Sequence, residues 1–170
     1  TYFQGDIYEG QWESGSKNGI GTLTYANGDF YSGEWKNNQK NGNGRLSYLN
    51  GDVYVGNWDN DKIQGKGILK YANGESYDGE WINGQKNGRG VFITKSNGKY
   101  IGEWENGMNN GQGTLTWPSG EKYVGTWKDN KRQRANLPPE TPKAQQKSQL
   151  SSPREEETHT HIFLGVVWEL

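Results

Sequence analysis

The sequence contains no cysteine and only two histidines, and its charges nearly balance, with a net charge of −1 at pH 7. Without cysteine the chain can form neither a disulfide framework nor a thiolate metal site. A net charge near zero, with no sustained basic run, gives no electrostatic footprint for nucleic acid. No segment is apolar for long enough to predict a transmembrane helix, and the N-terminus lacks the charged and apolar regions of a signal peptide.

Residues for catalysis and metal binding are scarce as well. His159 and His161 lie near the C-terminus, in a tail where no partner is held in place beside them. A histidine-based acid–base site or a Ser-His-Asp triad therefore has no scaffold, and no metal site is expected. Carboxylates such as Glu34 and Glu80 recur on the polar side of the strands, where solvated side chains are the ordinary case. We expect a protein that is not an enzyme and has no cofactor.

Hydrophobic residues make up only 29% of the chain, a fraction that would ordinarily indicate disorder. Aromatic residues, however, make up 13%, and Tyr and Trp bury a large area per residue. The apolar material is thus concentrated in a few large rings at fixed positions. That distribution suits a thin sheet better than a thick core of several layers.

These rings recur every 23 residues through the first 130 positions, without insertion or deletion. Each unit starts with Tyr, followed two residues later by Gly and four residues later by Trp. The tyrosines are Tyr8, Tyr31, Tyr54, Tyr77, Tyr100 and Tyr123, and the tryptophans are Trp12, Trp35, Trp58, Trp81, Trp104 and Trp127. A period of this length is typical of arrays whose units stack on their neighbours, and such arrays usually bind other molecules.

Each unit has the pattern of a β-hairpin. Residues 31–35 and 44–48 alternate large or Gly residues with small or polar ones, which predicts two strands. The cluster from Asn37 to Gly42 predicts a turn between them, and Asn50-Gly51 predicts the turn to the next unit. Glycines lie on the face of the rings, so we expect the rings to pack over bare backbone. The predicted fold is all-β, an elongated single-layer antiparallel meander of stacked hairpins.

The chain divides into three parts by composition. Residues 1–130 are predicted to form the array, of about five and a half repeats; 131–157 a disordered linker rich in Pro, Gln, Ser and Lys; and 158–170 an apolar tail segment. In the fourth unit Asn97 replaces a turn glycine, so a locally altered turn is expected there. Residues 2–5 align with 25–28, which predicts a strand of a preceding unit. The chain does not begin with Met, so we expect an excerpt of a longer protein or a processed form.

The units resemble the MORN (membrane occupation and recognition nexus) repeat family. The resemblance rests on Tyr-x-Gly-x-Trp followed by Gly-x-Gly in units of 23 residues, and it covers residues 1–130. It implies a stacked β-hairpin array. It also implies a non-catalytic module that binds proteins and, in some members, lipids.

The aromatic face of a single-layer sheet cannot be covered by a second layer of the same array. We therefore predict a scaffold or adaptor whose aromatic-lined groove captures an extended or helical protein segment, with Tyr54 and Tyr77 showing one ring edge to solvent. The predicted groove residues are Tyr31, Trp35, Leu46, Tyr48, Tyr54, Trp58, Leu69, Tyr71, Tyr77, Trp81, Phe92, Tyr100 and Trp104. We expect a cytoplasmic protein, associated with the cytoskeleton or a membrane.

Two alternatives remain open. Lysines in successive predicted turns would line one edge that meets anionic phospholipid head groups, which would make the array a membrane-associating module; they are Lys17, Lys40, Lys62 and Lys86. Alternatively, the array is the accessory domain of a larger enzyme.

The apolar segment 162–170 is costly to leave in water, so we expect it to dock on the array as an internal partner. The aromatic groove is the first docking site that we expect for this segment. A second, weaker docking site is offered by the polar-side residues Val91, Ile93, Ile101 and Val124.

Overall fold

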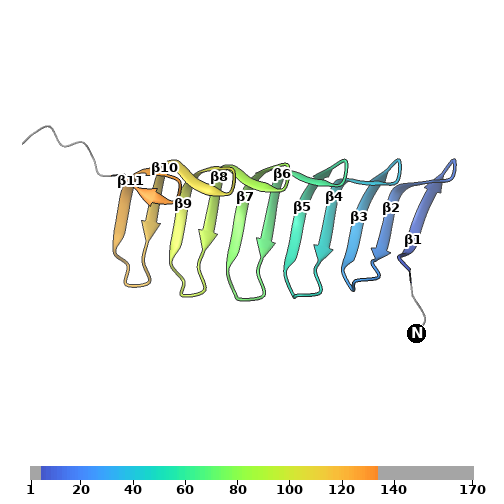
Figure 1. Ribbon diagram of the computed structural model, residues 1–170, viewed down its shortest axis with the longest axis horizontal. Helices are drawn as coiled ribbons and strands as arrows, with labels where there is room; N and C mark the ends of the chain where they lie inside the picture. The colour runs from blue at the N-terminus through green and yellow to red at the C-terminus, as the bar shows by residue number, and fades with distance from the viewer. Residues whose placement is uncertain (1–4, 134–170) are drawn as a thin grey trace, which may run out of the picture. The chain divides into compact units, whose positions relative to one another are not determined.

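A computed structural model describes residues 5–133 of the chain. Its strands form one sheet of 12 antiparallel strands, each next to its neighbour in sequence (Figure 1). The strands are β1 (Ile7–Glu13), β2 (Ser16–Thr24), β3 (Phe30–Lys36), β4 (Gln39–Ser47), β5 (Val53–Asp59), β6 (Lys62–Lys70), β7 (Ser76–Ile82), β8 (Gln85–Ile93), β9 (Lys99–Glu105), β10 (Met108–Thr116), β11 (Lys122–Lys128) and β12 (Lys131–Arg132). Over these residues the predicted all-β single-layer meander is confirmed.

The array extends to β12, two residues past the predicted boundary at residue 130. Trp127 pairs with Arg132 and Lys128 with Lys131 in this short strand. The predicted strand at residues 2–4, the linker beyond residue 133 and the apolar tail lie outside the described residues.

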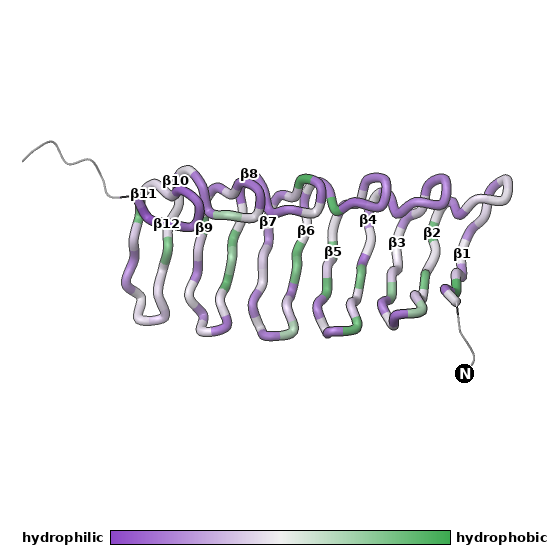
Figure 2. The backbone as a smooth tube through the Cα atoms, in the orientation of Figure 1, coloured by the Kyte–Doolittle hydropathy of each residue, from purple (hydrophilic) through white to green (hydrophobic). Residues whose placement is uncertain are grey.

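Two kinds of turn alternate along the array. Within a unit the turn has two residues with positive φ, such as Asn37 (49°) and Asn38 (69°), the conformation that matches the twist of a tight hairpin. The turn predicted from Asn37 to Gly42 is therefore shorter than expected, and Gln39 already begins β4. Figure 2 shows that the short turns within the units are mostly hydrophilic, whereas apolar residues gather along the strands.

Between units, a turn closes from the main-chain N–H of Gly51 to the carbonyl of Tyr48 (2.9 Å), with Gly51 at φ 92°. The expectation of an altered turn in the fourth unit is wrong. Asn97 takes the left-handed conformation (φ 65°) and donates the same hydrogen bond to Thr94 (2.9 Å), because Asn tolerates this region better than most residues.

The core is a continuous ladder of Tyr and Trp rings. Tyr31 lies edge to face between Trp35 of its own unit and Trp58 of the next, with centroid distances of 5.1 and 5.4 Å. The same arrangement links every unit to the following one. Such T-shaped pairs match the positive ring edge to the negative ring face. The ladder thus joins neighbouring hairpins into one array.

Bare backbone supports each tyrosine, as predicted. A side chain at Gly44 would overlap the ring of Tyr31, and one at Gly33 would meet both the Tyr31 hydroxyl and the backbone of Gly44. Gly33 and Gly44 are direct cross-strand partners. The paired glycines therefore leave the space that the ring fills.

Candidate functional site

The structure brings the predicted groove residues together on the aromatic face, but most of them are buried within it. The buried members are Tyr31, Trp35, Leu46, Tyr54, Trp58, Tyr77, Trp81, Tyr100 and Trp104. Tyr48, Leu69, Tyr71 and Phe92 are half-buried and keep some accessible surface.

The expectation that Tyr54 and Tyr77 show a ring edge to solvent is wrong, since both are 0% exposed. Tyr54 lies over the Gly56–Gly67 pair and between Trp58 and Trp81, at centroid distances of 5.4 and 5.6 Å. Burial raises the pKa of Tyr100 to about 12, and it raises the pKa values of Tyr54 and Tyr77 further. These rings hold the array together and cannot reach a partner without local unfolding.

A concave region with a volume of about 340 Å³ lies on the aromatic side. Its apolar wall comes from Leu46, Tyr48, Trp58 and Ile63, and its charged rim from Lys40, Asp61 and Lys62. We call it the aromatic hollow. Leu46, Tyr48 and Trp58 were predicted groove residues, whereas Ile63 was missed because its unit carries Ile where the neighbouring units carry Lys.

The predicted lysine edge differs from the structure in two ways. Lys17, Lys40 and Lys86 lie in β2, β4 and β8 rather than in turns. Their ammonium groups lie over aromatic rings, 4.7 Å from the Trp35 centroid, 4.8 Å from Trp58 and 4.5 Å from Phe92 respectively.

Lys62 does not belong to this row. It is one residue short of the 23-residue spacing from Lys40, and Ile63 occupies the equivalent position. Burial among the rings lowers the pKa of Lys86 below its ordinary value. The three aligned lysines therefore cover the aromatic face and contribute cation–π contacts.

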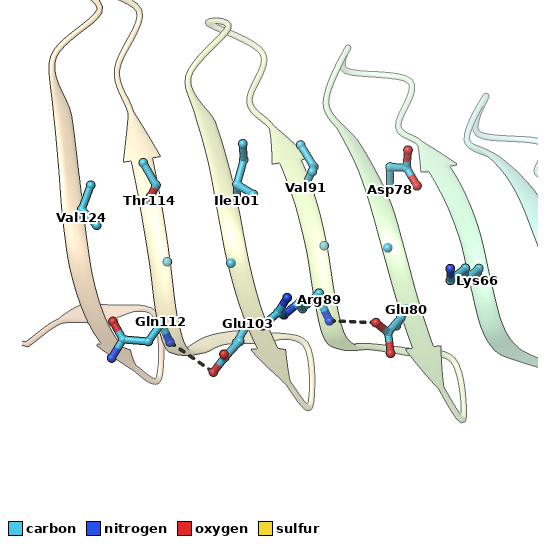
Figure 3. Close-up of a pocket in the computed structure, with 14 residues that line it drawn as sticks. Lys66, Asp78, Glu80, Arg89, Val91, Ile101, Glu103, Gln112, Thr114 and Val124 are labelled. Atoms are coloured by element: carbon cyan, nitrogen blue, oxygen red, sulfur yellow. Dashed lines mark hydrogen bonds between the residues drawn. The ribbon is translucent and has the colours of Figure 1, made fainter.

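A second, larger concave region of about 610 Å³ lies over β6–β11 on the opposite face. We call it the outward hollow. Figure 3 shows its side chains in two lines, an apolar one through Val91, Ile101 and Val124 and a polar one through Glu80, Arg89 and Glu103. Val91 pairs with Ile101 across the strands, as Arg89 does with Glu103.

The carboxylates of the outward hollow have a structural role. A β-bulge interrupts each of the first five hairpins, and in the fourth unit the register shifts between Gly79 and Glu80. Glu80 accepts a hydrogen bond from the main-chain N–H of Arg89 (3.3 Å), and Glu103 accepts one from Gln112 (3.2 Å; Figure 3). Glu34 does the same for Asn43 (2.8 Å). Sequence patterns did not predict this role, because a bulge leaves no mark in the alternation.

Within residues 5–133, no three His, Cys, Asp or Glu side chains gather as a metal site would require. Over the same part of the chain, no helix has the length and apolar character needed to span a membrane.

A single sheet of stacked hairpins, joined by a Tyr–Trp ladder over paired glycines, defines a β-hairpin repeat protein. Six consecutive matches to the family model described as MORN repeat cover residues 8–30, 31–53, 54–76, 77–99, 100–122 and 123–133. The chain belongs to the MORN repeat family, so the resemblance found in the sequence is confirmed. No curated protein matches the chain.

Among solved structures, the chain is similar to the TCP domain of SAS-4 (dCPAP) of Drosophila melanogaster, solved in complex with a proline-rich motif of Ana2 (dSTIL). The identity is 18%, the match covers 64% of this chain and 84% of that chain, and the TM-score is 0.23. A TM-score this low carries no conclusion about function.

Proposed function

We propose that the array is a non-catalytic scaffold that binds a segment of another protein. The observation that carries the proposal is a one-layer sheet with a concave surface on each face, partly apolar and partly charged. All the strands of residues 5–133 belong to this sheet, and a sheet face normally packs against another layer. Membership of a repeat family that builds scaffolds fits this function better than catalysis.

On the aromatic side, the partner would enter the aromatic hollow. Tyr48 and Ile63 are half-buried at its wall. An apolar side chain of the partner can therefore bury the part of their surface that is exposed to solvent. Lys40 and Lys62 at the rim favour a segment that carries an acidic residue beside its apolar one. The segment is extended or helical, and the chain's own residues 162–170 are one candidate.

The other predictions made from the sequence stay predictions. No observation on the described residues favours lipid binding, an accessory role in a larger enzyme, or a particular cellular compartment.

A peptide-display selection against the full chain tests the proposal. Peptides that bind should lose at least roughly tenfold in affinity when Tyr48→Ala and Ile63→Ala are combined. Leu49→Ala is the matched control, because Leu49 is an apolar side chain that lines neither hollow and is already exposed. Failure to select any binding peptide would contradict the scaffold function. Peptides indifferent to the double variant would exclude the aromatic hollow as their site.

A further inference from the structure

One row of outward-facing residues crosses the sheet from β1 to β11, each the direct cross-strand partner of the next. We call it the outward row. Its members are Glu9, Thr22, Ser32, Arg45, Val55, Ile68, Asp78, Val91, Ile101, Thr114 and Val124. The first four are polar, whereas five of the seven that follow are Val or Ile.

The first units can be compared with the later ones at this position. The first units form the same hairpins with Thr22, Ser32 and Arg45 at this position, so the fold does not require an apolar side chain there. β-branched residues favour strands, but Thr serves that preference as well as Val does. Nevertheless Ile101 is 48% exposed and Val124 is 74% exposed. An exposed apolar line that the fold does not need indicates a contact with another molecule.

Charges run beside the apolar line. In the neighbouring row of the outward hollow, Lys66 pairs across the strands with Glu80, and Arg89 pairs with Glu103. Their signs therefore alternate along the array. A partner that lay along the apolar line would therefore bind more favourably if the side chains on one of its sides carried charges opposite to these, in the same order.

The sheet also determines which backbone can lie on it. Strands β8, β9 and β10 each have a neighbour on both sides, so their main-chain N–H and C=O groups pair mainly within the sheet and offer no free strand edge to a peptide on this face. An extended peptide laid flat would lose water from its own backbone groups without new hydrogen bonds. An α-helix satisfies its backbone internally.

Spacing favours a helix as well. Neighbouring strands lie about 4.8 Å apart, so the outward row offers one side chain per 4.8 Å. A helix laid across the strands offers one apolar side chain per turn of about 5.4 Å, whereas alternate residues of an extended chain recur every ~6.7 Å. Across the four intervals from β7 to β11, about 19 Å in all, a helix of about 13 residues stays close to the row.

We propose that the outward row from Asp78 to Val124 binds an amphipathic α-helix of a partner protein, lying across β7–β11. The helix places one apolar side chain per turn on Val91, Ile101 and Val124, and charged side chains of alternating sign opposite Glu80, Arg89 and Glu103. This surface lies on the opposite face from the aromatic hollow and does not depend on it.

The test is a displayed library of helical peptides of about 14 residues, with Leu at each turn on one side and Glu, Lys, Gln or Ala elsewhere. Peptides are selected on the full chain and their affinities are measured by fluorescence anisotropy. Ile101→Lys and, separately, Val124→Lys should each weaken binding by at least roughly tenfold, because each puts an unpaired charge in an apolar contact. Thr22→Lys is the matched control at the same position of the polar half and should have no effect. Melting curves establish that each variant is folded.

Four results would overturn the proposal. One is that no helical peptide is selected, and another is that the selected peptides tolerate Ile101→Lys. The third is self-association or binding to anionic vesicles that Ile101→Lys abolishes while peptides remain unaffected, since the row would then serve a second copy or a membrane. Selected peptides that respond to Tyr48→Ala with Ile63→Ala instead would refute this surface and leave the scaffold function standing.

Discussion

The hydroxyl of Tyr77 donates a hydrogen bond to the main-chain carbonyl of Glu80, at 3.0 Å. Glu80 lies at the β-bulge of its hairpin, where the regular pairing of the strands is interrupted. The tyrosine therefore supplies the donor that the bulged backbone lacks, while its ring fills the space above Gly79 and Gly90. The equivalent bond recurs in every unit, from Tyr8 to Gln11 (2.9 Å) through Tyr123 to Thr126 (3.5 Å).

Tyr77→Phe should lower the free energy of unfolding by about 1–3 kcal/mol, because the ring stays while a partly buried carbonyl loses its donor. Tyr8→Phe should cost less, since the equivalent hydrogen bond in the first unit is exposed and water can replace it. Urea denaturation of both variants measures the difference. Equal losses at the two sites would show that the hydroxyl matters little for stability.

The sequence predicted the hairpins and the ring-over-glycine packing because both leave a strict 23-residue period. It did not predict the bulge opposite Glu80, since the two extra residues on β8, between Asn87 and Gly90, leave the alternation of sides unchanged. Tyr77, expected to show an edge to solvent, is fully buried because Trp81 and Trp104 flank its ring on both sides.

Gly90→Ala should lower the free energy of unfolding by roughly 1–3 kcal/mol or more, the cost of overpacking. The added methyl group would overlap the ring of Tyr77, which neighbouring Trp rings prevent from moving.

Gly74→Ala is the control for this prediction. A methyl group there meets nothing within 4 Å, and only the positive φ of 92° is unfavourable, at roughly 1 kcal/mol. A smaller loss at Gly90 than at Gly74, in the same denaturation measurement, would contradict the close ring–glycine packing.

Trp58→Ala should cost roughly 3–5 kcal/mol, the range for deleting a large buried aromatic side chain. Trp58 is 5% exposed and packs against two aromatic rings, Tyr31 and Tyr54, whereas Trp12 is 57% exposed and, within the described residues, packs against one aromatic ring, Tyr8. Trp12→Ala should therefore cost clearly less. Denaturation midpoints of the two variants measure this difference. Equal losses would argue against an array stabilised by contacts between neighbouring units.

The candidate surfaces were only partly predictable. Val91, Ile101 and Val124 stood out in the sequence as apolar residues on the polar side, and they do line the outward hollow. Ile93, grouped with them, belongs to another row, because it pairs with Ser76 and Lys99. Which apolar positions form one line depends on the registers of strands distant in sequence. The hollow itself depends on side chains from six strands, which no local pattern specifies.

Alkaline pH should destabilise the array as the unfolded state ionises. Burial raises the pKa of Tyr100 from 10.0 to about 12, so above pH 10.0 the unfolded chain loses a proton that the folded chain keeps. Stability is then fully present below pH 10 and falls as pH rises towards 12. Tyr31, Tyr54 and Tyr77 shift in the same direction, which makes the fall steeper. The lowered pKa of Lys86 acts in the opposite direction, because the folded chain loses this proton before the unfolded chain does, but it is a single group.

Urea midpoints measured from pH 9 to pH 11.5 check this pH dependence. Tyr100→Phe removes one of the titrating groups and should flatten the decline. A midpoint that stays constant over this range in the wild-type chain would mean that the buried tyrosines ionise as readily as exposed ones.

The aligned lysines should serve stability rather than membrane binding. The ammonium groups of Lys17, Lys40 and Lys86 lie over rings, and a cation–π contact contributes about 0.5–1 kcal/mol or more. Changing all three to Gln should therefore lower the melting temperature, while flotation with anionic vesicles stays as in the wild type. Lys62→Gln is the control, since Lys62 is exposed and lies outside the row. Salt-sensitive flotation of the wild type that the triple variant loses, while Lys62→Gln keeps it, would instead establish the lysines as a lipid-binding edge.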